Sequence, residues 1–255
     1  MKPMTLHNPT YRVVKILNAV SERNGSLSLS SIAKVCGIPV GTILPILRTL
    51  CEAGYLSCDP ETKTYAIGIR CFLTGTAFTR SSSSYEGVSA VVRMITDRTM
   101  ETAQYGLLEG GNVLYVAKSE SPQPVRMYAA IGRTLPAYGT AIGKALLSGL
   151  ENERVRELYS QGLAPLTEHT ITRFDELFLQ LDQIRKGGFA EECEESNLGI
   201  RCLAMPVHDR GGKVVGAVSV VIPLFRFSEQ KAIQIKDALR AASKNIEAMI
   251  PLMVS

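Results

Sequence analysis

The chain has 255 residues, of which 45% are hydrophobic, and it carries a formal net charge of +4 at pH 7. This length allows two domains that each bury a core, at about 100 to 200 residues per domain. Eight basic and four acidic residues lie between residues 1 and 70, so the N-terminal segment carries the whole charge excess. Such a segment is compatible with nucleic-acid binding, although many enzymes are equally basic.

The cysteines and the apolar stretches exclude several classes of protein. No Cys-x-x-Cys pair and no histidine at metal-ligand spacing accompanies the six cysteines, so we expect no zinc site, no disulfide framework and no cofactor. The longest apolar stretch, residues 214–225, is interrupted by Ser219 and Pro223 and is too short to span a bilayer. With no export signal at the start, these features predict a cytoplasmic protein without a membrane partner.

Two helices near the N-terminus are indicated by apolar residues at three- and four-residue spacing. The first stripe comprises Val13, Ile16, Leu17 and Val20, and the second comprises Leu29, Ile32, Ala33 and Cys36. Ser28 is a good N-cap for the second helix, and Gly37 is a good residue to end it. We therefore expect a first helix followed by a second that stops at a tight Gly-Ile-Pro turn.

A third helix and a hairpin follow this turn. The apolar face of the third helix comprises Ile43, Ile46, Leu47 and Leu50, and the helical pattern stops at Gly54. Residues 59–63 are typical of a hairpin tip between strands near Tyr55 and Tyr65. Three helices and such a wing form a winged helix-turn-helix, which reads DNA.

The candidate DNA contacts are polar or basic residues outside the apolar faces of this unit. Groove contacts are expected from Thr42, Arg48 and Thr49 of the third helix, and from Lys63 in the wing. Phosphate contacts are expected from Arg12, Lys15 and Lys34. Any single one of these charges is more often a solvated surface residue.

After residue 70 the pattern is helical again, up to four consecutive serines at positions 81–84. This run has poor helix propensity and no apolar face, so we place the domain boundary there, with residues 71–84 as a linker helix. The alternative is a solvated serine loop inside one domain. Residues 85–255 would then form the second domain.

The second domain alternates helical patterns with strand pairs. Glycine-rich turns join the predicted strands 102–108 and 113–119, and 202–207 and 214–221, as in antiparallel hairpins. Helices are predicted near residues 88–98, 141–150, 152–160, 174–186 and 228–249. These elements predict an α+β, sensor-like domain in which helices cover an antiparallel sheet.

Three blocks in this order resemble one known family. The first is Leu-Arg-Thr-Leu-x-x-x-Gly-Tyr-Leu at residues 47–56 with the wing after it; the second is Gly-Arg-x-Leu-Pro-x-x-x-Thr-Ala-x-Gly-Lys-Ala-Leu-Leu at 132–147; and the third runs from Gly188 to Val207. Together they are similar to the IclR-type bacterial transcriptional regulators over nearly the whole chain. The resemblance implies an N-terminal winged helix-turn-helix, a linker helix and a GAF-like effector-binding domain. Family members usually act as dimers or tetramers on palindromic operators of double-stranded DNA.

The resemblance also implies an effector pocket for a small metabolite, often a carboxylate. By position, its residues are Thr140, Ala141, Ile142, Glu192, Cys202 and Ser219. The first three begin a helix, whose free N–H groups suit a carboxylate. Glu192 could instead be a solvated acid among its acidic neighbours, and Cys202 could be a small core residue.

Two departures from the family pattern affect function. Where relatives commonly have Lys-Ser-Thr and an Arg three residues later, this chain has Val40, Gly41, Thr42 and Pro45. If Thr42 is the N-cap, Pro45 lies in the first turn and is tolerated, and the recognition helix is short. Val221 replaces a second pocket serine, which suggests a less polar or differently shaped effector.

We therefore expect a ligand-responsive, sequence-specific DNA-binding regulator, a repressor of a catabolic operon. The alternative is a metabolite-sensing or protein-interaction module whose DNA recognition is impaired by Pro45. Cys202, Glu192 and a histidine could be imagined as a catalytic set, but no catalytic motif supports it, so we expect no enzyme.

Overall fold

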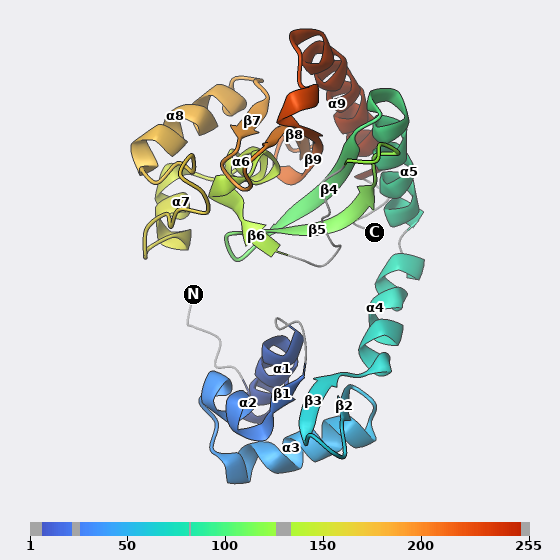
Figure 1. Cartoon of the computed structure of the whole chain (residues 1–255), viewed down its shortest axis with the longest axis vertical. Helices are drawn as coiled ribbons and strands as arrows, with labels where there is room; N and C mark the ends of the chain where they lie inside the picture. Colours follow the sequence, from blue (N-terminus) through green and yellow to red (C-terminus); the bar gives the residue numbers. More distant parts are fainter. Residues whose placement is uncertain (1–6, 22–25, 82, 126–133, 251–255) are drawn as a thin grey trace. The chain divides into compact units, whose positions relative to one another are not determined.

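The chain forms two compact units, Met1–Ser81 and Ser82–Ser255. The computed structural model describes residues 7–21, 26–81, 83–125 and 134–250 (Figure 1). An N-terminal helix-turn-helix unit precedes an α+β unit, which is the predicted fold class.

The N-terminal unit places its helices around a small three-stranded sheet of order β1-β3-β2. Its elements are α1 (Asn8–Ser21), β1 (Leu27–Ser28), α2 (Leu29–Cys36), α3 (Val40–Glu52), β2 (Leu56–Cys58), β3 (Thr64–Ile67) and α4 (Ile69–Ser81). β1 was not predicted because it has only two residues and no pattern of its own; it exists because Leu27 pairs with Tyr65 of β3. No single described helix has the length and apolar composition to cross a membrane, and α2 with α3, which meet that test only together, are bent by 112° at their junction.

The predicted caps of α2 are confirmed. The Ser28 hydroxyl accepts a hydrogen bond from the Ser31 N–H at 3.3 Å, and Gly37 ends the helix with a φ of 62°. That left-handed φ costs glycine no clash with a side chain. The helix buries Ile32, Ala33 and Cys36, so its predicted apolar face is the one that packs.

The expected start of α3 is wrong. The helix begins at Val40, because the Thr42 and Ile43 N–H groups both bond to the Pro39 carbonyl, at 2.9 and 3.0 Å. Pro39 is therefore the N-cap, and Pro45 is the sixth residue of a 13-residue helix rather than part of its first turn. The helix continues through the proline because buried side chains along its length, those of Ile43, Leu47 and Leu50, pack into the core.

The predicted hairpin tip lies between β2 and β3. Its turn is held by Asp59, whose Oδ1 accepts hydrogen bonds from the N–H groups of Glu61 and Thr62, each at 2.8 Å. These bonds favour the charged carboxylate and lower the pKa of Asp59. Lys63 completes the turn with a φ of 53°.

The serine run is helical where the structure describes it, although serine has poor helix propensity. Ser81 ends α4, while Ser83 and Ser84 open α5 (Ser83–Thr99). Serine is a poor helix former by well under 1 kcal/mol per residue, so longer flanking helices can include it. The linker helix expected at residues 71–84 overlaps α4, which runs from Ile69 to Ser81, and its last two residues lie in α5.

The C-terminal unit is built on a six-stranded antiparallel sheet of order β6-β5-β4-β9-β8-β7. Its strands are β4 (Thr102–Glu109), β5 (Asn112–Ser119), β6 (Thr134–Pro136), β7 (Ala190–Cys193), β8 (Ile200–His208) and β9 (Val214–Pro223). Its helices after α5 are η1 (Ala137–Gly139), α6 (Ala141–Leu147), α7 (Asn152–Leu158), α8 (Phe174–Arg185), η2 (Leu224–Arg226) and α9 (Glu229–Met249). The two predicted hairpins are β4–β5 and β8–β9; the short strands β6 and β7 were not predicted.

Each face of this sheet has its own core. α5 and α9 cover one face, and α6, α7 and α8 lie on the other (Figure 1). Alternate side chains of β9 therefore point to opposite faces: Val218 and Val220 pack toward α5 and α9, whereas Ala217 and Val221 pack toward α6. Any polar side chain on the α6 face must therefore be paired or must line a cavity.

Candidate DNA-binding surface and effector cavity

One face of α3 is exposed. It carries Gly41, Pro45, Arg48, Thr49 and Glu52, at helical spacing. Arg48 supplies the basic group of this face. The Thr49 hydroxyl donates to the Pro45 carbonyl at 3.0 Å and is thus engaged within the helix. Thr42, the third candidate on α3, is half-buried beside this face.

The remaining DNA-contact candidates lie in different settings. Lys34 on α2 and Lys63 in the hairpin turn are exposed, and Arg12 on α1 is half-buried. Lys15 forms a hydrogen bond within the protein: its Nζ donates to the Cys36 carbonyl at 2.8 Å. This bond ties α1 to the C-terminus of α2, where the helix dipole favours a cation.

A cavity on the α6 face of the large sheet brings all six effector candidates together. The cavity is narrow, with a volume of about 20 Å³. Its walls are formed by Gln104, Tyr115, Leu135, Thr140, Ala141, Ile142, Glu192, Ser196, Cys202, Ser219 and Val221. Sequence reasoning missed Gln104, Tyr115, Leu135 and Ser196.

The register of the strands explains why these side chains meet. Glu192 of β7 lies opposite Cys202 of β8, and Cys202 lies opposite Val221 of β9. Ser219 of β9 lies opposite Gln104 of β4. Residues paired across neighbouring strands point to the same face, so these two rows form the floor of the cavity.

The start of α6 forms the facing wall. Thr140 is the N-cap, and its hydroxyl accepts the Gly143 N–H at 3.0 Å. A side chain at Gly143 would overlap the backbone of Ala137, so glycine permits this close packing. Ala141 and Ile142 are the first two helical residues, and an α-helix offers their N–H groups no internal acceptor.

Glu192 is a buried acid with hydrogen-bond partners rather than a solvated one. It is 2% exposed, its Oε2 accepts the Glu195 N–H at 2.9 Å, and its Oε1 accepts the Ser196 hydroxyl at 3.1 Å. Burial raises the pKa of Glu192, and these bonds oppose that effect. Burial, together with the neighbouring Glu192, raises the pKa of the Cys202 thiol well above its ordinary value. Cys202 belongs to the core and lines the cavity as well.

Ser219 presents an unsatisfied polar group. Its hydroxyl oxygen is buried and has no hydrogen-bond partner within the described part of the chain. Gln104 beside it is 3% exposed. A buried hydroxyl without a partner costs about 1 to 3 kcal/mol, which a hydrogen-bonding ligand would recover. Gln104 could have been found from sequence as the polar residue that alternates with apolar neighbours in a buried strand.

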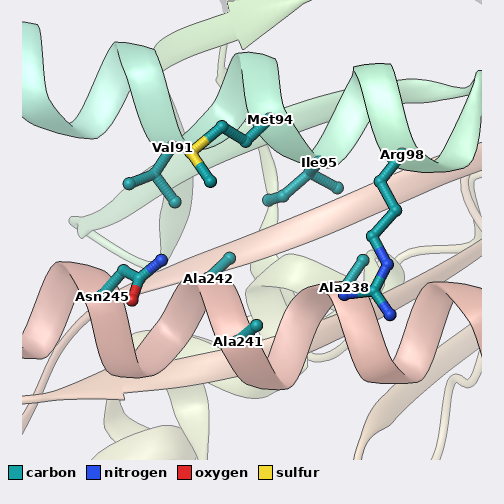
Figure 2. A pocket seen from close by; sticks show the side chains of 8 residues that line it. All are labelled: Val91, Met94, Ile95, Arg98, Ala238, Ala241, Ala242 and Asn245. Atoms are coloured by element: carbon teal, nitrogen blue, oxygen red, sulfur yellow. The ribbon is translucent and has the colours of Figure 1, made fainter.

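A second groove lies between α5 and α9 and contains none of the predicted site residues. Figure 2 shows Val91, Met94, Ile95 and Arg98 on α5 opposite Ala238, Ala241, Ala242 and Asn245 on α9. The alanines allow the two helices to approach closely over the second core. Its lining is mainly apolar, so this groove lacks the convergent polar groups of the cavity beside α6.

Comparisons with known proteins identify the family. The profile described as "Bacterial transcriptional regulator IclR C-terminal" matches residues 81–248, and "IclR helix-turn-helix domain" matches residues 10–60. The chain belongs to the IclR family of bacterial transcriptional regulators. IclR proteins are DNA-binding regulators and not enzymes, and the helix-turn-helix match gives no support to the alternative of a sensor without DNA recognition.

Individual relatives cover most of the chain. The "HTH-type transcriptional regulator KdgR" of Dickeya chrysanthemi is 32% identical over 236 residues, 92% of this chain and 77% of the relative. The "Transcriptional repressor IclR" of Escherichia coli is 29% identical over 238 residues, 92% and 87% of the two chains. The crystal structure of an IclR homologue from Microbacterium hydrocarbonoxydans, complexed with 4-hydroxybenzoate, shares the fold with a TM-score of 0.77 at 23% identity, covering 94% of this chain and 97% of that one.

Proposed function

We propose that this IclR protein is a ligand-responsive, sequence-specific repressor of a catabolic operon, and that it senses a small metabolite carboxylate in the cavity between α6 and the sheet. The cavity carries this proposal, because opposite the start of a helix it holds the buried Ser219 hydroxyl, which has no hydrogen-bond partner among the described residues. Repression is the activity in the name of the Escherichia coli relative. Since its target is DNA, we place the protein in the cytoplasm.

The chemistry of the cavity suggests the class of effector. The N–H groups of Ala141 and Ile142 would receive the carboxylate, and Ser219 with Gln104 would bond a second polar group. Leu135, Ile142 and Val221 would contact an apolar part between them. The 4-hydroxybenzoate bound to the Microbacterium homologue has this combination of carboxylate, apolar ring and hydroxyl.

DNA contacts are proposed for polar residues of the N-terminal unit that are exposed or half-buried. Arg48, with Thr42 and Thr49 beside it, would enter the major groove, while Lys63 of the wing, Lys34 and Arg12 would contact phosphates. Because Pro45 replaces a polar side chain on the same face, DNA shape would contribute more of the specificity.

A homodimer, or a tetramer made of dimers, is proposed as the working form. α4 exposes Ile69, Phe72 and Leu73, with exposed fractions of 71%, 66% and 49%, at the spacing of one helical face. A second copy of α4 would cover this stripe and pair two reading helices for a palindromic operator. If the effector binds two conformations of the protein with unequal affinity, its binding would change the spacing of the two reading helices.

A mobility-shift titration tests the function. Purified protein is titrated against DNA from upstream of its own gene, with scrambled competitor, at several salt concentrations, with and without 4-hydroxybenzoate and pyruvate. We expect a shift that survives competitor and is released by at least one carboxylate. Glu192→Ala or Cys202→Ala should change this response without abolishing DNA binding.

Arg48→Ala provides the matching change on the DNA side. It should weaken operator binding by about 1 to 3 kcal/mol, as for loss of a base contact, and leave carboxylate binding intact. The control is Glu52→Ala, an acidic residue exposed on the same helix. Binding that never exceeds that of the competitor, at any salt concentration, would contradict the proposal.

A further inference from the structure

Lys144 is a fully buried lysine beneath the effector cavity. It belongs to α6 and has an exposed fraction of 0%. Its Nζ donates three short hydrogen bonds, to Glu195 Oε1 at 2.6 Å, Gln180 Oε1 at 2.7 Å and the Glu191 carbonyl at 2.9 Å. These three bonds use every proton of the ammonium group.

Glu195 connects this lysine to the cavity. Its carboxylate is paired with Lys144, while its own N–H donates to Glu192 Oε2 at 2.9 Å. Its carbonyl accepts the Thr170 hydroxyl at 2.6 Å. The turn from Glu192 to Ser196 is therefore held on both sides, and Glu192 and Ser196 are the parts of it that line the cavity.

Lys144 also belongs to the opposite wall. Its N–H bonds to the Thr140 carbonyl at 2.9 Å, one turn below the residues that begin α6. The first turn of α6 and the Glu192–Ser196 turn both line the cavity, so Lys144 connects two parts of its lining. Through Gln180 it also reaches α8.

Stability alone does not explain a charged residue at this position. Removing two ions from water costs several kcal/mol each, and replacing a buried ion pair by apolar residues of similar volume is often neutral or stabilising. The desolvation cost of the pair is larger because Glu195 Oε2 is buried without a hydrogen-bond partner in the described part of the chain. An apolar residue could fill the space, but it could not hold three acceptors in fixed positions.

We propose that Lys144 is a positioning residue for the effector cavity: by holding Glu195, Gln180 and the Glu191 carbonyl, it sets the distance between α6 and the Glu192–Ser196 turn. This inference rests on the proposed effector function. Lys144 touches no ligand in this arrangement and acts through Glu192, whose orientation depends on the Glu195 N–H.

The test separates positioning from stability by means of two variants. Lys144→Met alone leaves Glu195 buried without its ion-pair partner, and the variant could fail to fold. The double variant Lys144→Met with Glu195→Leu removes both charges at similar volume. Lys236→Met is the matched control, because Lys236 pairs with Glu191 at 2.8 Å next to Glu192 but has a side chain that is 36% exposed.

Two measurements are made on the full-length protein. The first is amide hydrogen exchange, without ligand, in peptides covering residues 137–147 and 190–199. The second is the affinity for 4-hydroxybenzoate and pyruvate. For the double variant, we expect melting within a few degrees of the parent, at least tenfold faster exchange in residues 192–196, and at least tenfold weaker binding of any probe that the parent binds.

If the double variant folds and keeps the amide exchange rates and ligand affinity of the parent, the inference is overturned. So would equal losses in Lys236→Met, since these would point to general surface electrostatics. If the parent binds neither probe, the proposed ligand class has failed, and hydrogen exchange alone then decides whether Lys144 holds the turn. A double variant that does not fold would also count against it, because the pair would then be needed for folding.

Discussion

Burial and hydrogen bonding act in opposite directions on Glu192. Burial, the larger effect, raises the pKa of its carboxyl, whereas bonds from Cys202, the Glu195 N–H and Ser196 lower it. A negative charge at this point would repel a carboxylate ligand, while a protonated Glu192 could donate a hydrogen bond to it. The protonation state of this residue therefore couples the cavity to pH.

The sign of this coupling follows from linkage. The folded protein binds the proton of Glu192 more tightly than the unfolded chain does, so the stabilising contribution is complete below the ordinary pKa of 4.5 and is lost as pH rises through the folded value. We expect Glu192→Gln to raise the free energy of unfolding at pH 8, by about 1.4 kcal/mol for each unit of pKa shift that it removes, and to have little effect at pH 4. Denaturant titrations at both pH values measure this.

The control for this prediction is Glu191→Gln, because ion pairs with Lys236 and Arg201 lower the pKa of that neighbour. This substitution should destabilise the protein at pH 8 rather than stabilise it. The same sign for both variants would contradict the account of Glu192.

At the scale of elements, α3 shows packing prevailing over propensity. Pro45 lacks the N–H that would bond to the Gly41 carbonyl, and a proline inside a helix costs about 3 kcal/mol. The helix persists because its buried side chains on either side of the proline hold both halves against the core. The backbone hydrogen bond that Pro45 removes is on the exposed face of α3, the face that would enter the DNA major groove.

We expect Pro45→Ala to stabilise the N-terminal unit by up to about 3 kcal/mol, because it restores a backbone hydrogen bond and removes a clash. Thermal unfolding followed by circular dichroism measures the change. Thr49→Ala is the comparison, since it removes only the hydroxyl bond to the Pro45 carbonyl, and it should change stability by less than about 1 kcal/mol. A Pro45→Ala protein no more stable than the parent would show that the helix has already relaxed around the proline.

At the scale of the whole molecule, α4 carries an exposed apolar stripe that nothing in the described part of the chain covers. Its apolar stripe is exposed in a unit whose core already includes α1, α2 and α3. Large exposed apolar side chains at helical spacing are typical of an interface. A symmetric contact between two copies of α4 would use the same stripe on each.

We expect Phe72→Glu to convert the proposed dimer to a monomer and to weaken operator binding at least a hundredfold, because like charges would face each other across its two-fold axis. Sedimentation equilibrium measures the mass, and a mobility shift measures the affinity. Thr74→Glu, exposed on the other side of α4, should leave both unchanged. An unaltered dimer in Phe72→Glu would place the interface elsewhere.

Local patterns in the sequence were sufficient for much of the fold. Ser28 and Gly37 delimit α2, and the residues around Asp59 form the turn of the wing, because caps and turns depend on neighbours in the chain. The two long hairpins and the helical faces followed from periodicity for the same reason. The family motifs added the six candidate residues that the structure places around one cavity.

Only the tertiary structure decided features that depend on partners distant in the chain. β1, β6 and β7 are too short to show a pattern and exist through pairing, and α3 continues through Pro45 because of its contacts with the core. Gln104 joins the cavity through its register with Ser219, and Lys144 finds Glu195, 51 positions later, through the packing of α6 on the sheet. The sequence by itself thus determined the elements, the family and part of the cavity lining; which polar groups are buried, paired or left without a partner depended on strand register and helix packing.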